Sequence, residues 1–212
     1  MSEGRRSDMA KSSRKRKNSS SALPPKAVKK KVFPVRYVVY GVAVLALIGA
    51  GYGFFTSQQV EGAFDALAAA GKGELERVEE FPSEGRTHLA VGSEISYGTH
   101  PPTSGPHYLQ WINPGFYETL KGWSNLVHSL EHGMIVIYYD RPADDALETL
   151  KSWTSLFTGP WSGIVMVRKA GLGEKLILTA WRRMLRLERF EIEAAAAFIN
   201  AYRGRGPENP VR

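Results

Sequence analysis

The sequence predicts an α+β (or α/β) fold in which a central sheet with flanking helices is preceded by a single N-terminal transmembrane helix and a disordered basic tail. Residues 134–204 alternate β-branched and aromatic runs with amphipathic stretches, in the order strand, helix, strand, strand, helix. An uncharged apolar run lies upstream, and basic residues crowd its N-terminal side. The expected organisation is a disordered basic cytoplasmic tail at 1–35, a transmembrane helix at 36–56, a linker or stalk helix at 57–74 and an exported globular domain at 75–208.

The positive charge of the chain belongs to its N-terminal tail. The formal net charge is +7, but residues 1–36 hold twelve basic and two acidic residues, so they carry +10 and the rest carries −3. Binding to nucleic acid depends on cations placed against phosphates, so the folded part is predicted to have no nucleic-acid partner. The tail is rich in Ser, Lys and Pro and poor in apolar side chains, a composition that predicts disorder.

Residues 37–55, "YVVYGVAVLALIGAGYGFF", contain no charged residue. As a helix these nineteen residues would span about 28 Å, close to the roughly 30 Å of a bilayer's hydrocarbon core. A cleaved signal peptide is disfavoured, because its apolar region would be shorter and would precede a small-residue cleavage site. The flanking cations place the N-terminus in the cytoplasm. We therefore expect a single-pass protein of the cell (plasma) membrane that contacts the lipid bilayer through 36–56, with its C-terminal domain extracytoplasmic and its protein partners unknown.

The first part of the exported region mixes a helix with irregular chain. Apolar residues at helical spacing predict a helix over 58–70, which "GKG" ends. Short strands are expected around a turn at 82–85. Residues 97–117 combine Pro, Gly and aromatic side chains without periodicity, which is typical of a functional loop.

The second part carries clearer periodic signals. A buried strand is predicted at 134–140 and a helix at 142–156. The β-rich runs 162–169 and 175–181 flank "AGLGE" and predict a β-hairpin, and a closing helix is expected at 188–204. The four arginines of "WRRMLRLER" (181–189) are interpreted as an exposed surface.

All five histidines of the chain lie between residues 88 and 132. Neutral imidazole is the commonest metal ligand in proteins, so this clustering favours a metal site. The chain has no cysteine, so a finger-type structural zinc site is excluded and ligands must come from His, carboxylate or Met. The five are His88, His100, His107, His128 and His132.

The stretch "HSLEHG" places two histidines four residues apart. His128 and His132 share one side of a helix, and also of a strand, with Glu131 beside them. The intervening apolar positions would then face a core. Gly133 permits a sharp turn into the strand that follows.

Three interpretations of these residues compete. In an H-x-x-E-H protease the helix supplies two zinc ligands and Glu131 the base, but Gly133 and a strand follow at once and only 155 residues are exported. In a histidine-based site, Zn or Cu would be bound by two to four of His88, His107, His128 and His132, with Glu131 as orienting residue or ligand and Met134 as a soft ligand for Cu(I). In the third, the imidazoles form a hydrogen-bond network that fastens the loop to the sheet. Spacing does not separate the last two.

Ser104 is a poor candidate for a nucleophile, because "PPTSGPH" lacks the G-x-S-x-G pattern and favours a turn or cap role.

Three stretches carry a resemblance to a known family: "GRTHLAVGSEISYGTHPPTSGPHY" at 85–108, "GFYE" at 115–118 and "VHSLEHGMIVIYY" at 127–139, with a looser match over 179–208. Together they resemble the bacterial membrane-anchored family of domain of unknown function 3105. The resemblance implies no activity. It implies a motif that includes His88, Pro101, Pro102, Ser104, Gly105, His107, His128, Glu131, His132 and Gly133. His100 falls at a looser position and is the weakest candidate ligand.

The function expected from the sequence is thus a single-pass membrane-anchored extracytoplasmic domain of unassigned activity with a His-based metal or small-ligand site. Two alternatives stay open: a metal-dependent hydrolase with Glu131 as base, and a non-catalytic cell-envelope scaffold with a structural histidine network.

Overall fold

The computed structural model describes residues 35–212, except for the side chains of 35–38, 41, 44 and 50–57. Residues 1–34 of the predicted basic tail lie outside this range. Helix α1 runs from Val35 to Ala70. Within the described part of the chain, no helix is both long enough and apolar enough to cross a membrane. The predicted span at 36–56 falls largely on side chains that are not described, so it stays a prediction.

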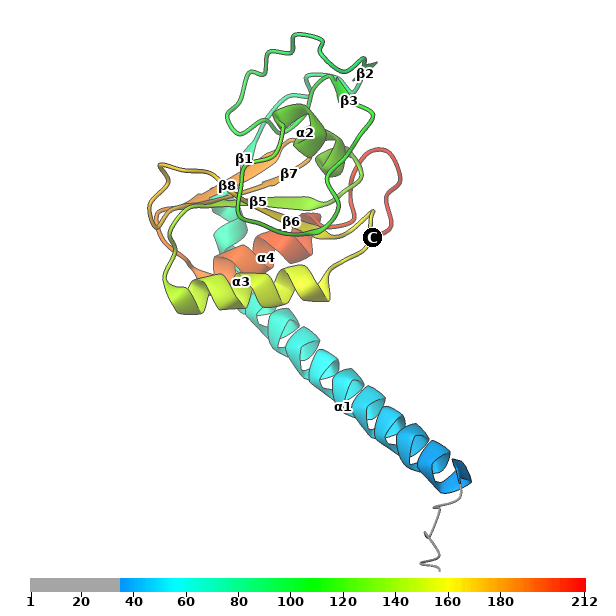
Figure 1. Cartoon of the computed structure of the whole chain (residues 1–212). Helices are drawn as coiled ribbons and strands as arrows, with labels where there is room; N and C mark the ends of the chain where they lie inside the picture. Colours follow the sequence, from blue (N-terminus) through cyan, green and yellow to red (C-terminus); the bar gives the residue numbers. More distant parts are fainter. Residues whose placement is uncertain (1–34) are drawn as a thin grey trace, which may run out of the picture. The chain divides into compact units, whose positions relative to one another are not determined.

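A six-stranded mixed sheet forms the centre of the domain (Figure 1). Its order is β1-β8-β7-β5-β6-β4, with β4, β6 and β5 parallel and the β5–β7, β7–β8 and β8–β1 pairs antiparallel. The α+β fold with a central sheet and flanking helices is therefore confirmed. The strands are β1 (Glu79–Glu80), β4 (Gly115–Tyr117), β5 (Ile135–Tyr139), β6 (Ile164–Arg168), β7 (Leu176–Ala180) and β8 (Arg183–Leu187).

The predicted hairpin between 162–169 and 175–181 is wrong. Both strands form, but β5 lies between them, parallel to β6 and antiparallel to β7. The true hairpin joins β7 to β8 through Trp181 and Arg182, whose φ of +63° makes the tight turn. The arginine-rich run read as surface is thus a strand, in which Met184, Leu185 and Leu187 are buried and the arginines are not.

The two faces of the sheet are covered differently. On the face that we call the helical face, Ile135 and Ile137 of β5 pack in an apolar cluster with α3 (Asp144–Leu156) and α4 (Ile192–Tyr202). Phe64 and Ala68 near the end of α1 belong to the same cluster. The core of the domain therefore includes residues that precede the predicted boundary at 75.

On the opposite face, which we call the site face, Val136 and Tyr138 of β5 pack with Leu126 and Leu130 of α2 (Trp123–Glu131). Figure 1 shows α2 on the far side of the sheet from α3 and α4, beneath a small second sheet. That sheet is the parallel pair β2 (His88–Leu89) and β3 (His107–Tyr108). A 3-10 helix, η1 (Gly71–Arg77), links α1 to β1.

Candidate metal centre

Two of the histidines are brought together by the β2–β3 pair. In its register His88 lies opposite His107, and their ring centroids are 4.8 Å apart. The backbone N–H of His107 donates to the Thr87 carbonyl at 3.0 Å, which holds the two strands in this register. Residues nineteen apart in the sequence thus share one edge of the site.

The Pro/Gly-rich segment before β3 is a buried scaffold. Its buried residues include Pro101, Pro102, Ser104 and Gly105. The Ser104 hydroxyl accepts a hydrogen bond from the Glu84 N–H at 3.0 Å, a structural role of the kind predicted. Gly105 has φ +127°, and a Cβ there would press on the Tyr97 ring, so glycine is required. These residues act by positioning His107.

Helix α2 has an apolar side against the sheet and a polar side against the chain after β3. Three side chains predicted to face a core are fully buried: Leu126, Val127 and Leu130. On the polar side, the Ser124 hydroxyl accepts from the Tyr108 N–H at 2.7 Å, and the Ser129 hydroxyl accepts from the Ile112 N–H at 2.9 Å. This division of the helix aims His128 at β2 and β3, where its ring centroid lies 4.9 Å from that of His88 and 4.8 Å from that of His107.

The C-terminal segment packs against the turn between α2 and β5. Gly133 turns the chain with φ +97°, and its carbonyl accepts from the Gly204 N–H at 2.8 Å. Gly206 lies so close that a Cβ on it would collide with the Glu131 carbonyl oxygen. This contact places Glu208 beside the end of α2.

Glu131 faces the two strand histidines from α2. Its Oε2 lies 2.9 Å from His107 Nε2 and 3.6 Å from His88 Nε2. Together with His128, these residues offer donor atoms that all lie within 4.8 Å of one another. This group could hold a metal ion.

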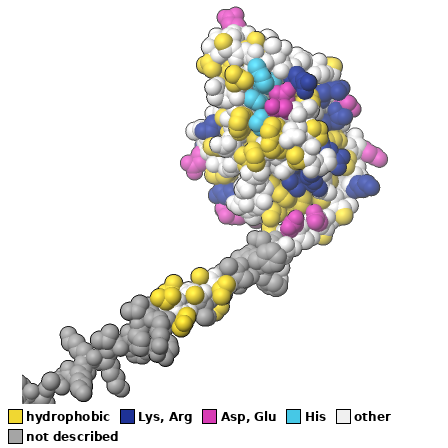
Figure 2. All heavy atoms as spheres, turned by 90° about the vertical axis from the view of Figure 1, so that its right-hand side faces the viewer, with side chains coloured by type: hydrophobic (Ala, Val, Ile, Leu, Met, Phe, Trp, Pro, Cys, Tyr) yellow, Lys and Arg dark blue, Asp and Glu magenta, His cyan; other side chains and the backbone are white. Residues whose placement is uncertain are grey.

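Glu208 forms a second group with the two helix histidines. Its Oε2 lies 3.1 Å from His132 Nε2 and 3.9 Å from His128 Nε2, and the donor atoms of the three residues again lie within 4.8 Å of one another. Glu208 is partly exposed, as is His88, so solvent reaches both groups. Figure 2 shows histidine side chains gathered on one face of the domain beside acidic ones.

Three of the imidazoles are oriented by backbone carbonyls. The Nδ1 atoms lie at hydrogen-bond distance from carbonyl oxygens: His107 from Gly105 at 2.8 Å, His128 from Tyr108 at 2.8 Å and His132 from Pro160 at 3.2 Å. A carbonyl only accepts, so each Nδ1 carries the proton. In the neutral ring Nε2 then presents its lone pair, which is the arrangement that carbonyl partners impose on metal-ligating histidines.

The contact between His107 and Glu131 tests whether a metal would fit. Among the described residues, His107 Nε2 and Glu131 Oε2 are buried atoms without a hydrogen-bond partner, although they lie 2.9 Å apart. Two lone pairs at that distance repel unless a proton or a cation lies between them. Two ligands each about 2.1 Å from one metal ion would be about 3.0–3.4 Å apart. The residues present therefore fit a metal ion.

The electrostatics of His128 keep its lone pair available. The pKa of His128 is lowered to about 4, chiefly because burial disfavours the charged ring. The bond to the Tyr108 carbonyl opposes this shift, and the neighbouring imidazoles of His107, His132 and His88 contribute to it. His128 is therefore uncharged at neutral pH.

The comparison with family models agrees with the motif on which this site is built. A model described as protein of unknown function (DUF3105) matches residues 88–212, which begin at His88 and include all six residues of the two groups. The chain belongs to this family. No curated protein and no solved structure matches it. Membership of DUF3105 assigns no activity, so function has to be argued from the site.

Two tryptophans flank the second group. The Trp161 ring stacks on His132 with centroids 4.1 Å apart, and the Trp111 ring lies 4.7 Å from the same imidazole. Met134, considered as a soft ligand, is instead fully buried in the apolar cluster with Val136 and Tyr138.

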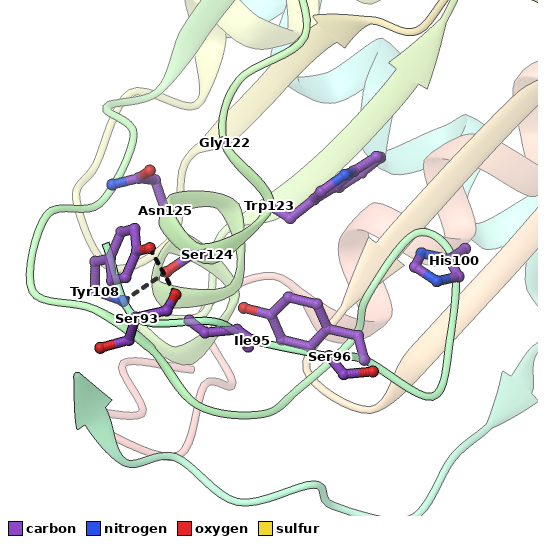
Figure 3. A pocket seen from close by; sticks show the side chains of 10 residues that line it. Ser93, Ile95, Ser96, His100, Tyr108, Gly122, Trp123, Ser124 and Asn125 are labelled. Carbon is purple, nitrogen blue, oxygen red and sulfur yellow. Dashed lines mark hydrogen bonds between the residues drawn. The ribbon is translucent and has the colours of Figure 1, made fainter. Parts of the chain in front are cut away.

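His100 is not a member of either group. It lines a pocket of about 450 Å³ together with Trp123 and Asn125 (Figure 3), and no residue of the two groups lines that pocket. The Tyr108 ring also lines this pocket, while its carbonyl holds His128. The structure thus brings together His88, His107, His128, His132 and Glu131 and leaves His100 apart.

Sequence reasoning missed Glu208. It lies seventy-six residues after His132, in a segment with no secondary structure of its own. The available signal was "GRGPE" (204–208), in which closely spaced Gly and Pro indicate a chain held in a fixed path, at the end of the looser family match.

Proposed function

We propose that this domain is a metal-binding module whose ligands are His88, His107, His128, His132, Glu131 and Glu208. The observation that carries the proposal is the set of Nδ1 bonds to carbonyls, which aims Nε2 lone pairs at two carboxylates. Because Nδ1 of His107 donates to a carbonyl, Nε2 of the neutral ring faces the Glu131 carboxylate as an acceptor, and either a cation or an added proton must lie between them. Imidazole and carboxylate without thiolate suit Zn²⁺ or Cu²⁺.

Metal analysis of the purified full chain tests the proposal. The wild type should retain Zn²⁺ or Cu²⁺ after loading and gel filtration, as measured by mass spectrometry of the bound metal. His107→Ala should reduce it, whereas the matched control His100→Ala should not, because His100 lies in the same loop but outside both groups.

A metal-free, folded wild type whose melting temperature is the same with and without a chelator would overturn the proposal. The His107–Glu131 pair would then share a proton instead of a cation, which is the network expected of a cell-envelope scaffold.

We also propose that the domain is displayed outside the cytoplasm by a single-pass anchor at 36–56. The uncharged run at 37–55 and the +10 charge of residues 1–36 support this topology. A reporter enzyme that works only outside the cytoplasm should be active when it is fused after Arg212. Activity of a reporter that works solely in the cytoplasm would contradict the topology.

A metal-dependent hydrolase is the second candidate, favoured by the His128, His132 and Glu208 group. Two imidazoles and one carboxylate also hold catalytic zinc and leave a coordination position open to water. Here Glu131 would be the base, but its contact with His107 favours a ligand role. Metal-dependent turnover of esters or peptides that survives Glu131→Gln would remove Glu131 as base.

A further inference from the structure

The six proposed ligands divide into two sets of the same composition. Each carboxylate lies within 4.0 Å of two imidazole Nε2 atoms, and no imidazole is shared between the carboxylates in these described contacts. The first half-site consists of His88, His107 and Glu131. The second half-site consists of His128, His132 and Glu208.

Each half-site is sufficient for one divalent ion. Two imidazoles and one carboxylate form a complete protein ligand set for zinc, with a fourth position left for solvent or substrate. The carboxylate–imidazole distances run from 2.9 to 3.9 Å, around the roughly 3.0–3.4 Å expected of two ligands on one ion. Small side-chain rotations at the partly exposed His88 and Glu208 bring the longer distances into range.

The two half-sites are neighbours without merging into one. His128 groups with the residues of the first half-site within 4.8 Å, and its ring centroid lies 4.8 Å from that of His107. The second half-site's His132 and Glu208 group only with His128. Six ligands arranged in this way exceed what one tetrahedral ion uses and are enough for two neighbouring ions with three protein ligands each.

We infer that the centre is dinuclear, with one divalent ion in each half-site. This inference rests on the proposed function. Two divalent ions and two carboxylates leave a net charge of +2 at the centre, so the open positions between the ions suit an anionic oxygen, either hydroxide or a phosphate-type oxyanion. The ligand class implied is therefore an oxyanion that bridges both metals.

The half-sites depend on different parts of the chain, which allows them to be separated. The first is built by β2, β3 and α2. The second needs the C-terminal segment, because the close packing of Gly206 on the Glu131 carbonyl positions Glu208. Loss of Glu208 should therefore leave the first half-site intact.

Metal stoichiometry of the full chain is the decisive measurement. The wild type should bind two equivalents of Zn²⁺ per chain, and Glu208→Gln and Glu131→Gln should each bind one. The exposed carboxylate Glu118 supplies the matched control, since Glu118→Gln should still bind two. Circular dichroism establishes whether each variant is folded. The metal stoichiometry of the wild type tests the inference even if a variant fails to fold.

The wild type loaded with Cu²⁺ tests whether the two ions are adjacent. At two equivalents of Cu²⁺, the unpaired electrons of ions about 4 Å apart should couple magnetically. The electron paramagnetic resonance signal should then broaden, and its intensity should be less than twice the intensity measured at one equivalent. Binding of one equivalent would overturn the inference and leave the proposed function standing. Binding of none would overturn both, and two equivalents with uncoupled spectra would show that the ions are not adjacent.

Discussion

One face of the central sheet is covered by regular helices, and the other mainly by irregular chain around a single short helix. On the helical face, α3 and α4 bury side chains such as Phe198 and Trp153 completely or nearly so against the strands. On the site face, α2 covers the strands, and its Ser124 and Ser129 hydroxyls accept hydrogen bonds from the backbone N–H groups of Tyr108 and Ile112. Neighbouring residues of β5 serve both faces, because side chains alternate along a strand.

The two faces therefore differ in how their polar groups are satisfied. Apolar burial on the helical face stabilises the fold, since it removes large side chains such as Phe198 from water. The site face instead keeps His107 Nε2 and Glu131 Oε2 buried and unpartnered among the described residues, a costly arrangement unless something binds there.

Truncation on the helical face should have the largest effect. Phe198 is fully buried, so Phe198→Ala should lower the free energy of unfolding by about 3–5 kcal/mol in urea denaturation of the full chain. Metal stoichiometry of the protein that remains folded should not change. A parallel loss of metal would show that the two faces are not separable.

Acidification should act on the site face. The unfolded chain protonates the imidazole of His128 near pH 6.5, whereas burial keeps it neutral in the folded protein until about pH 4. The free energy of unfolding of metal-free protein should therefore fall, on the order of 3 kcal/mol from this group, as pH drops from about 6.5 to 4. His128→Asn keeps an N–H for the Tyr108 carbonyl and should lose this component of the pH profile. An unchanged profile would refute the assignment.

Metal should stabilise the wild type and Phe198→Ala equally. Free metal at about one hundred times its dissociation constant should raise the free energy of unfolding by about 2.7 kcal/mol for each ion bound. Because the ligands lie on the opposite face from Phe198, the increment should be the same in both proteins. Thermal melts with excess metal and with chelator measure it, and a smaller gain in Phe198→Ala would reveal coupling across the sheet.

Gly206→Ala should have the smallest effect on stability. Its Cβ would collide with the Glu131 carbonyl, so the C-terminal segment must shift, at about 1–2 kcal/mol, and Glu208 leaves the second half-site. Gly73→Ala is the control, because a Cβ there meets open space, and it should change stability by less than about 0.5 kcal/mol. Full metal binding by Gly206→Ala would contradict the role of this contact.

The sequence predicted those parts of the fold that depend on local pattern. The strand at 134–140 and the helix at 142–156 were identified because burial on one side imposes a period that neighbouring residues reveal. The predicted hairpin is wrong because strand pairing is not local. Strand β5 lies between β6 and β7, and the sequence of 162–181 contains no signal that an earlier strand pairs with both of them.

The candidate site is likewise predictable from the sequence only where its residues follow a local pattern. His128, Glu131 and His132 are recognisable from their spacing, which puts the two histidines on one side of either a helix or a strand, and His88 and His107 from the concentration of histidines in one part of the chain. Glu208 was not recognisable, because its position depends on Gly204 and Gly206 packing against Gly133 from the far end of the sequence.

The local sequence thus established the candidate ligand types, the absence of thiolate and the placement of His128 and His132 on one side of the chain, since residue identity and short-range spacing are read directly from neighbouring positions. The tertiary structure was needed to show that His88 lies opposite His107, that each carboxylate faces two imidazoles, and that Glu208 joins the second group. These relations arise from register and close packing between distant segments, whose free energy depends on contacts that no local stretch contains.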